Sequence, residues 1–121
     1  MSRRWEFFLA YMIDAARELI ARRAAVTRQA LDDDHAVLDN FMMRFMVLGE
    51  AAKKIPPEVK ARYPQVDWRG MMGLRDVIAH SYYRLNPNVL WNAAEEILPA
   101  ELPFLEEIAH EHPLPEDGEA D

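Results

Sequence analysis

Apolar residues recur along most of the chain every three or four positions, which is the spacing that lines one face of an α-helix. The pattern predicts a first helix over residues 4–23, a second over residues 34–55 and a third over residues 68–81. A fourth is predicted to begin at Asn86-Pro87, because proline is favoured in the first turn of a helix. No stretch alternates as a β-strand does. We therefore expect an all-α fold, an antiparallel bundle of four main helices.

Capping residues and prolines indicate where these helices begin and end. Thr27 can cap a short turn after the first helix, and the aspartates at residues 32–34 favour the start of the second. Asp67 is in position to cap the third. The prolines expected to end, kink or split helices are Pro56 and Pro57 after the second helix, and Pro99 and Pro103 within the fourth.

The middle of the second predicted helix, FMMRFMVLG at residues 41–49, is apolar on nearly every side. A helix of this kind is covered on more than one face. In a chain of 121 residues a second subunit is a natural cover, so we expect a homodimer whose seam includes residues 41–48. Charged substitutions at Met42, Met43 or Met46 should then separate the subunits.

Length and composition suit one domain, expected over residues 1–112 and followed by a disordered acidic tail over residues 113–121. The residues of the fourth helix expected to face inward are Val89, Leu90, Ala94, Ile97, Leu98, Leu102, Leu105 and Ile108. The chain has no cysteine, no apolar run near the ~20 residues of a membrane span, and no signal-peptide pattern at its start. These features predict a soluble cytoplasmic protein that is not associated with a membrane.

The net charge of −7 argues against broad affinity for nucleic acids, yet the charge is unevenly distributed. Residues 51–75 carry a net charge of +4 and residues 76–121 carry −10. A local basic groove is therefore compatible with an acidic protein. The basic cluster of Lys53, Lys54, Lys60 and Arg62 can be an ordinary solvated face or can border such a groove.

The stretch RDVIAHSYY, residues 75–83, lies where the basic segment meets the acidic one. At about 100° per residue, a helical projection separates a polar side from an apolar one. The polar side holds Arg75, Asp76, Ala79, His80, Tyr82 and Tyr83, and the apolar side holds Met71, Leu74, Val77 and Ile78. Asp76 lies one turn before His80 and can hydrogen-bond its imidazole.

These residue types suit phosphoryl transfer on RNA. The arginine fork binds and neutralises a phosphate, and a histidine moves protons near neutral pH. The 2′-hydroxyl of RNA is a nucleophile already next to its phosphodiester, so cleavage needs a base, an acid and charge stabilisation but no metal or other cofactor. Each chain supplies one such histidine at Arg75-x4-His80, and a dimer would supply two.

The pattern R-x4-H alone is weak, since chance gives about 0.4 instances in a chain of this composition, but adding a tyrosine two residues later lowers that to about 0.01. The full R-x4-H-x-Y, at Arg75, His80 and Tyr82, resembles the HepT-like toxins of the HEPN superfamily. The surrounding block LGEAAKKIPPEVKARYPQVDWRGMMGLRDVIAHSYY (48–83) and NVLWNAAEEILPAEL (88–102) also resemble that family, over about residues 5–110.

The resemblance implies a helical homodimer that acts as a metal-independent endoribonuclease toxin. It further implies a partner, a minimal nucleotidyltransferase antitoxin of the MntA type, which silences the toxin by adding AMP to the motif tyrosine. Carried onto this sequence, Arg75 and His80 are the catalytic pair, Asp76 is the supporting polar residue and Tyr82 is the modified tyrosine. Tyr83 has no clear motif role.

Other interpretations of these residues remain open. Arg75 and His80 can be solvated residues at a helix end, where the helix dipole favours histidine, and Tyr83 can simply cover that end. The chain can also be a non-catalytic binding subunit of a nucleotidyltransferase, or a structural helical dimer. Glu107-x-x-His110 has a spacing used in di-iron bundles, but one such motif is too few for that site, so we expect no metal.

Overall fold

The computed structural model describes residues 4–115, and within that range the chain is helical and has no strand. The elements in order are α1 (Trp5–Ala25), α2 (Ala30–Asp33), α3 (His35–Lys53), α4 (Pro57–Arg62), α5 (Trp68–Ser81), the 3₁₀ turn η1 (Tyr82–Arg84), α6 (Pro87–Asn92), the π-helical segment η2 (Ala93–Ile97) and α7 (Leu98–Glu111). The predicted all-α fold with four main helical segments is confirmed: α1, α3, α5 and the run from α6 to α7.

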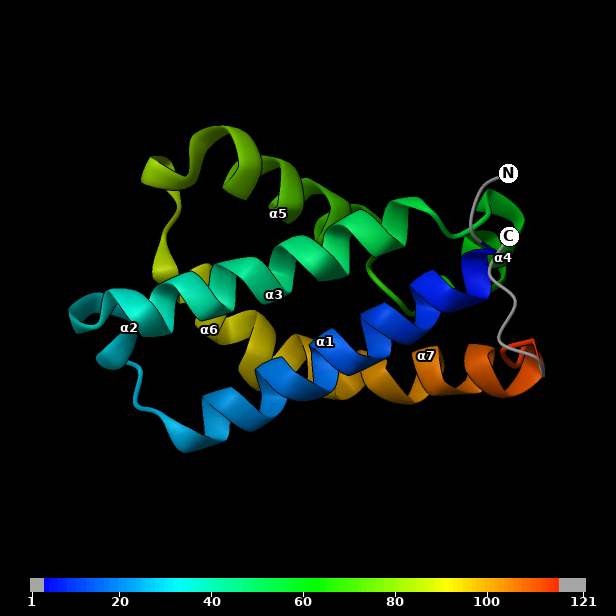
Figure 1. The fold of residues 1–121 in the computed structure, drawn as a ribbon, viewed down its shortest axis with the longest axis horizontal. Coiled ribbons are helices and arrows are strands. Elements are labelled where there is room, and N and C mark those ends of the chain that lie inside the picture. The colour runs from blue at the N-terminus through cyan, green and yellow to red at the C-terminus, as the bar shows by residue number, and fades with distance from the viewer. Residues whose placement is uncertain (1–3, 116–121) are drawn as a thin grey trace.

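Successive long helices run in opposite directions (Figure 1). Helix α3 lies in the centre, with α5 along one side and α1 along the other, and α7 packs against α1. Helix α1 begins, and α7 ends, at the end of the bundle that holds α4, whereas α2 and the end of α5 lie at the other (Figure 1). Among residues 4–115, no other helix covers the long side of α5 that faces away from α3 (Figure 1).

Local capping explains why the helices begin where they do. The Thr27 hydroxyl accepts from the Ala30 amide at 3.3 Å and so caps the turn that leads into α2, as predicted. The carboxylate of Asp34 caps α3, and the carboxylate of Asp67 accepts from the Gly70 amide at 2.9 Å to cap α5. The third predicted helix, 68–81, coincides with α5. Asn86 caps α6, and Pro87 occupies its first turn.

The prolines of the fourth helix interrupt it less than predicted. The path from α6 to α7 is continuous, but it widens into a π turn at η2, just before Pro99 in the first turn of α7. Proline lacks an amide hydrogen and clashes with the carbonyl four residues earlier, and a wider turn relieves both problems. Pro103 is contained inside α7.

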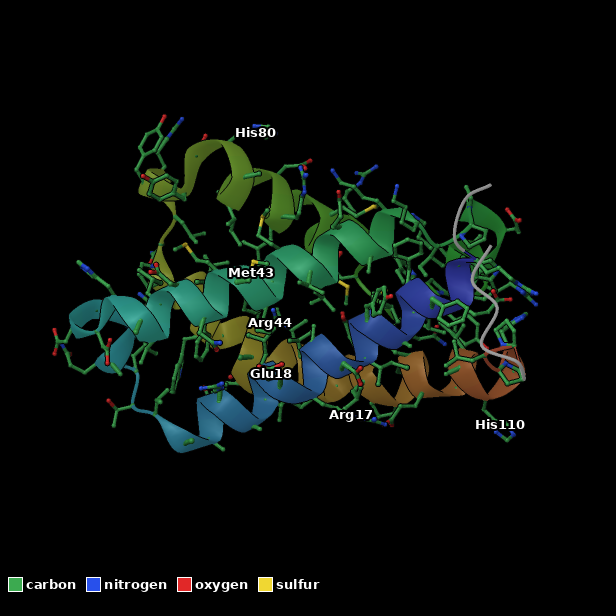
Figure 2. All side chains as sticks on the ribbon, in the orientation of Figure 1. Arg17, Glu18, Met43, Arg44, His80 and His110 are labelled. Carbon is green, nitrogen blue, oxygen red and sulfur yellow. The ribbon has the colours of Figure 1, made fainter. Side chains whose placement is uncertain are left out.

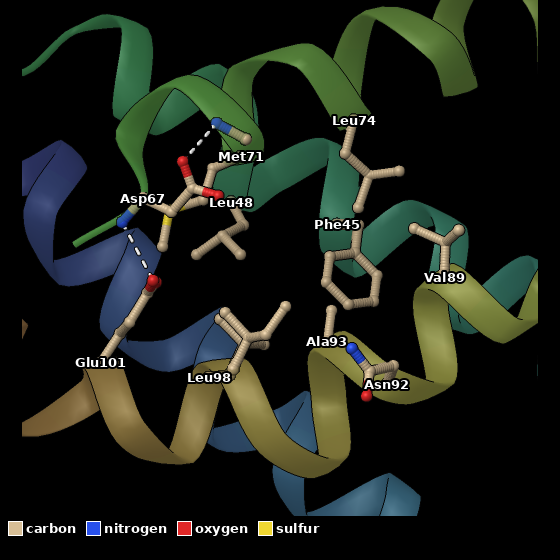
Figure 3. Close-up of a pocket in the computed structure, with 12 residues that line it drawn as sticks. Phe45, Leu48, Asp67, Met71, Leu74, Val89, Asn92, Ala93, Leu98 and Glu101 are labelled. Carbon is tan, nitrogen blue, oxygen red and sulfur yellow. Dashed lines mark hydrogen bonds between the residues drawn. The ribbon is translucent and has the colours of Figure 1, made fainter. Parts of the chain in front are cut away.

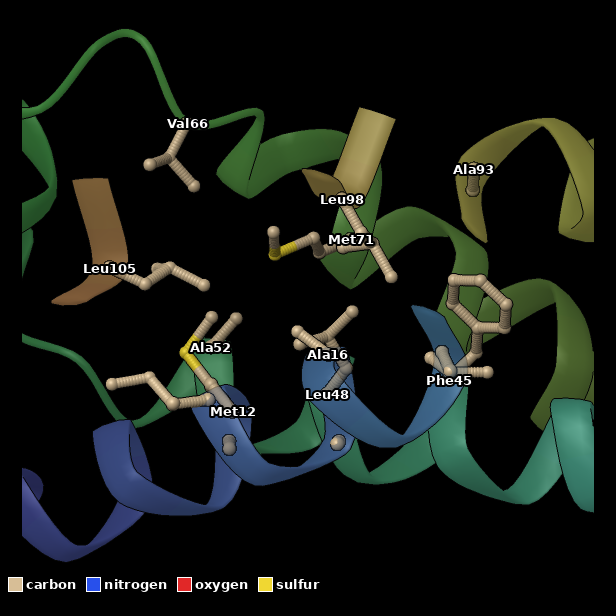
Figure 4. Packing of buried hydrophobic residues seen from close by; sticks show 14 of the residues in the cluster. Met12, Ala16, Phe45, Leu48, Ala52, Val66, Met71, Ala93, Leu98 and Leu105 are labelled. Carbon is tan, nitrogen blue, oxygen red and sulfur yellow. The ribbon is translucent and has the colours of Figure 1, made fainter. Parts of the chain in front are cut away.

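Apolar side chains from α1, α3, α5 and α7 form one core, part of which is seen in Figure 4. Its largest fully buried side chains include Leu9, Met12, Phe41, Leu48, Leu90, Leu98, Leu105 and Ile108. Three residues predicted to face inward are instead substantially exposed: Val77, Val89 and Ile97. Val89 and Ile97 line the rim of a pocket between helices, and this explains their exposure.

Helix α3 is buried on two sides, as its apolar sequence predicts, but it keeps one exposed apolar edge. Phe41, Phe45 and Leu48 are buried, whereas Met43 is 55% exposed. A shallow apolar groove of about 290 Å³ runs here between α1 and α3 and is lined by Phe8, Tyr11, Met43, Met46, Val47, Glu50 and Ala51. On α3, the exposed apolar surface thus lies at Met43, whereas Met42 is partly buried.

Residues 113–115 follow α7 without helical structure, and the rest of the predicted acidic tail, residues 116–121, lies outside the described residues. Among the helices of residues 4–115, none has both the length and the apolar character needed to cross a membrane.

Candidate active site

The start of α5 is fixed from two directions, so the residues that follow it have a defined position. Asp67 caps the helix with its carboxylate, while its own amide donates to Glu101 Oε2 of α7 at 2.9 Å. The indole of Trp68 donates to the Tyr63 carbonyl at 3.0 Å. Glu101 is only 6% exposed, and burial raises the pKa of its carboxyl. Its role here is to tie α7 to the beginning of α5.

These contacts border a pocket of about 260 Å³ between α3, α5 and the run from α6 to α7 (Figure 3). Phe45 and Leu48 form one wall, Met71 and Leu74 another, and Glu101 lies at one end of the pocket (Figure 3). The pocket separates α5 from α7 on the core side of α5. It is therefore distinct from the polar side that carries the motif.

Arg75 lies midway along α5, against α3, and its side chain is 21% exposed. Gly49 of α3 makes this approach possible, because a Cβ built on Gly49 would overlap both Arg75 Cβ and the Met71 carbonyl oxygen. Arg75 Nε lies 3.4 Å from Glu50 Oε1, at ion-pair distance but without hydrogen-bond alignment. Its Nη1 donates to Asp76 Oδ1 at 3.1 Å. The guanidinium is thus held by packing and by two carboxylates.

Asp76 contacts cations rather than the histidine. Its Oδ1 accepts from Lys53 Nζ of α3 at 2.8 Å as well as from Arg75. Both hydrogen bonds, first that of Lys53 and then that of Arg75, hold the pKa of the Asp76 carboxyl below its usual value. The predicted hydrogen bond to His80 is not present. The reason is that lysine and arginine, both cationic, lie within reach of the carboxylate, and their charge strengthens the hydrogen bonds they donate to it.

His80 lies in the last turn of α5, is exposed, and points away from the bundle (Figure 2). Within residues 4–115 no hydrogen bond or ion pair orients its ring. The prediction that Arg75 and His80 share the polar side of one helix is consistent with their positions on α5. Their support differs, because only Arg75 is held by other side chains.

The helical projection fails for Tyr82 and Tyr83, because α5 ends at Ser81 and residues 82–84 form the 3₁₀ turn η1. Ser81 has φ −151° and ψ 38°, which breaks the helical path before either tyrosine. The predicted angle of about 20° between Tyr82 and Arg75 therefore does not apply. Tyr82 is 63% exposed and Tyr83 is 76% exposed, and their rings meet edge-on with centroids 6.0 Å apart. Such exposure does not fit Tyr83 as a cover for the helix end.

The site contains three residues that the motif does not predict: Gly49, Glu50 and Lys53. They lie on α3 and contact α5, with Lys53 three residues after Glu50 and four after Gly49. This helical spacing is the signal that could have identified them. That signal required knowing that α3 and α5 are neighbours. Glu107 and His110, the possible metal ligands, lie on α7, and residues 4–115 hold no group of three or more His, Asp or Glu side chains suited to a metal ion.

The family model described as "Ribonuclease HepT-like" matches residues 12–108. "Putative RNase TTE0752" of Caldanaerobacter subterraneus subsp. tengcongensis is 26% identical over 99 residues, which is 82% of this chain and 85% of the relative. "Putative RNase MJ0127" of Methanocaldococcus jannaschii is 39% identical over 62 residues, 51% of each chain. "Probable ribonuclease HepT" of Thermococcus cleftensis is 37% identical over 54 residues, 45% of this chain and 49% of the relative.

The matches to the last two relatives thus span about half of their length. No solved structure matches the chain. The family match extends from α1 to α7 and includes the whole of α5, so it covers both the bundle and the motif. The chain belongs to the HepT-like ribonuclease family, as the resemblance predicted.

Proposed function

We propose that this protein is a metal-independent RNA endonuclease, the toxin of a HepT/MntA-type toxin–antitoxin pair that acts on cytoplasmic RNA. The observation that carries the proposal is the position of Arg75 and His80 on the open side of α5, at the R-x4-H-x-Y motif, in a chain of the HepT-like ribonuclease family. Relatives named as RNases support RNA as the substrate.

In the proposed reaction, the 2′-oxygen of a ribose attacks the adjacent phosphorus, and the bond from phosphorus to the 5′-oxygen breaks. The products are a 2′,3′-cyclic phosphate and a 5′-hydroxyl end. Arg75 binds the phosphate and stabilises the charge that grows on its oxygens. His80 transfers a proton, either from the 2′-hydroxyl or to the leaving 5′-oxygen. Before RNA binds, Asp76 supports Arg75 by holding its guanidinium.

A homodimer would supply the second histidine. The apolar groove between α1 and α3 is the surface we propose for the seam, because the exposed side chains of Tyr11 and Met43 lie together there. Glu50 lines this groove and also pairs with Arg75. A second copy seated on the groove would therefore bring its own Glu50 and Arg75 close to those of this chain.

We propose Tyr82 as the site where the antitoxin silences the enzyme. Its phenol is 63% exposed and lies two residues after His80, so a partner can reach it. In the reaction, the phenol oxygen attacks the α-phosphorus of ATP and pyrophosphate leaves. The added AMP brings a negative phosphate and a large group to the end of α5, where both would obstruct RNA. Co-expression with a neighbouring nucleotidyltransferase should add mass in AMP units at Tyr82, and the addition should be lost in Tyr82→Phe. Modification confined to Tyr83 would contradict this assignment.

The central test uses purified protein and a labelled RNA in the presence of EDTA. We expect cleavage that leaves a cyclic phosphate. His80→Ala should lower the rate by about 10²- to 10⁴-fold through loss of proton transfer. Arg75→Ala should have a comparable effect through loss of phosphate stabilisation. Full activity in either variant would contradict the catalytic assignment.

A second candidate function is a non-catalytic subunit that docks with a nucleotidyltransferase. The feature that favours it is charge: Glu50 and Asp76 already neutralise Arg75 and Lys53, on a chain of net charge −7. Docking and modification without any RNA cleavage by the wild-type protein would favour this function instead.

A further inference from the structure

Lys53 and Arg75 come from different helices and meet at a single atom. Lys53 Nζ of α3 donates to Asp76 Oδ1 at 2.8 Å, and Arg75 Nη1 of α5 donates to the same oxygen at 3.1 Å. The two nitrogens are therefore no more than about 5.9 Å apart. Two cationic donors converging on one anionic oxygen are a suitable pair for a phosphate oxygen.

We propose that Lys53 is a second phosphate-binding residue of the RNA site and shares one backbone phosphate with Arg75. Asp76 Oδ1 then occupies the position that a non-bridging phosphate oxygen takes when RNA binds. This inference rests on RNA as the substrate, and it adds to the motif a residue that lies on another helix, 22 positions before Arg75 in the sequence.

The other members of the basic cluster have different partners, and this makes Lys53 distinct. Lys54 Nζ lies 6.0 Å from the centre of the Phe8 ring, at the α1 side of α3. Lys60 Nζ donates to the Ala52 carbonyl at 3.1 Å, and burial lowers its pKa. Arg62 lies 3.5 Å from His112. Of these four cations, Lys53 is the one that contacts the motif on α5.

The exchange of a carboxylate for a phosphate is physically accessible at this site. The side chain of Asp76 is 50% exposed, so it can rotate into water without losing core contacts. Lys53 is also accessible to solvent, whereas Arg75 is held in place by α3. At rest the two cations and the two carboxylates, Glu50 and Asp76, balance in charge. An incoming phosphate would replace one of these anions and keep that balance.

An ordinary surface ion pair between Lys53 and Asp76 is the competing explanation, and it would contribute little to stability or RNA binding. The two explanations differ in how binding depends on salt. Each phosphate contact to single-stranded nucleic acid contributes about 0.7 to the slope of log affinity against log salt. Loss of a true phosphate contact lowers that slope, whereas loss of a surface ion pair leaves it unchanged.

The experiment measures affinity for an RNA whose 2′-hydroxyls are methylated, so that it binds without being cleaved, at several salt concentrations. Lys53→Ala should lower the slope by about 0.7 and weaken binding at low salt by about tenfold. Lys54→Ala is the matched control, since it removes the neighbouring charge, at the C-terminal cap of α3, and it should change the slope much less. Lys53→Arg should restore most of the affinity. This rescue rules out misfolding as the cause.

Equal slopes and equal cleavage rates in Lys53→Ala and Lys54→Ala would overturn the inference. If the proposed function alone is wrong, the pattern differs: Lys53→Ala still weakens RNA binding, but the wild-type protein does not cleave the RNA. No binding of RNA by the wild-type protein would overturn both.

Discussion

Arg75 and His80 lie five residues apart on α5, yet one chain supports these two side chains very differently. Arg75 packs against Gly49, is flanked by Glu50 and Asp76, and is mostly buried. His80 is exposed in the last turn, has no hydrogen bond from residues 4–115, and is followed by a break in the helix at Ser81. The phosphate-binding half of the proposed site is therefore preformed in a single chain, and the proton-transfer half is not.

This difference in support indicates that Arg75 is ready to bind a phosphate, whereas His80 depends on the substrate or a second subunit for its orientation. A preformed cation site loses little freedom when it meets RNA, so it can provide affinity. An exposed histidine contributes efficiently only when the substrate or a second subunit positions its ring. The proposed dimer seam, next to Glu50, is where such a second subunit would contribute.

The contact between α3 and α5 at Gly49 should be the most sensitive point of the preformed half. Gly49→Ala places a methyl group against Arg75 and the Met71 carbonyl, so α5 must move away from α3. We expect a loss of about 1–3 kcal/mol in the free energy of unfolding and a fall in cleavage of about 10²-fold from displacement of Arg75.

Gly73→Ala is the matched control, because a Cβ at Gly73 meets nothing within 4 Å. In the interior of α5 that change should stabilise the protein by about 0.5–1 kcal/mol. Urea unfolding and RNA cleavage assays measure both variants. Similar stability and activity in the two would show that the close approach at Gly49 is unimportant.

The proposed seam should respond to charge on α3. Met43→Glu puts a carboxylate into the apolar groove, and we expect the dimer to dissociate and cleavage to fall with it. Because Met43 is exposed in one chain, the monomer should stay folded. Light scattering and circular dichroism check both points. A wild-type protein that is monomeric at micromolar concentration would contradict the homodimer.

The two halves should also differ in their contribution to stability. Arg75→Ala removes a partly buried side chain and its ion pairs, so we expect a loss of about 0.5–1.5 kcal/mol. His80→Ala changes an exposed residue and should stay within about 0.5 kcal/mol of wild type. Thermal unfolding of the two variants makes the comparison, and an equal loss in both would contradict it.

The smallest effect should be that of Asp76 on the pH dependence. Because its folded pKa is lowered, its contribution to stability is present above the unfolded pKa and is lost only as pH falls through the lower, folded value. Stability between pH 5 and 8 should therefore not depend on the titration of Asp76. Asp76→Asn should leave the midpoint of the pH–rate profile unchanged. A shifted midpoint would show that Asp76 acts on the histidine after all.

Much of this molecule follows from local sequence rules, and the exceptions have a common cause. The caps at Thr27, Asp67 and Asn86 are local interactions, and each was predictable. The hydrogen bond between Lys53 and Asp76 was not predictable, because Lys53 lies on α3, 23 residues earlier in the sequence. A helical projection of α5 alone includes no residue of another helix. The position of Tyr82 was mispredicted because the projection assumes that the helix continues past Ser81. The burial of Val77 was mispredicted because the projection assumes that the whole apolar side of the helix is covered. The residues of the motif could be identified from sequence, but the side chains that hold them could not.

The most direct test of the contrast between the two halves compares RNA affinity with RNA cleavage in His80→Ala. If Arg75 and its neighbours bind the phosphate without the histidine, the Kd of the variant for uncleaved RNA should remain within about twofold of wild type, while cleavage falls by about 10²- to 10⁴-fold. Arg75→Ala, measured beside it, should lose both affinity and cleavage. Cleavage at the wild-type rate by His80→Ala, or a loss of affinity as large as that of Arg75→Ala, would contradict this division of roles.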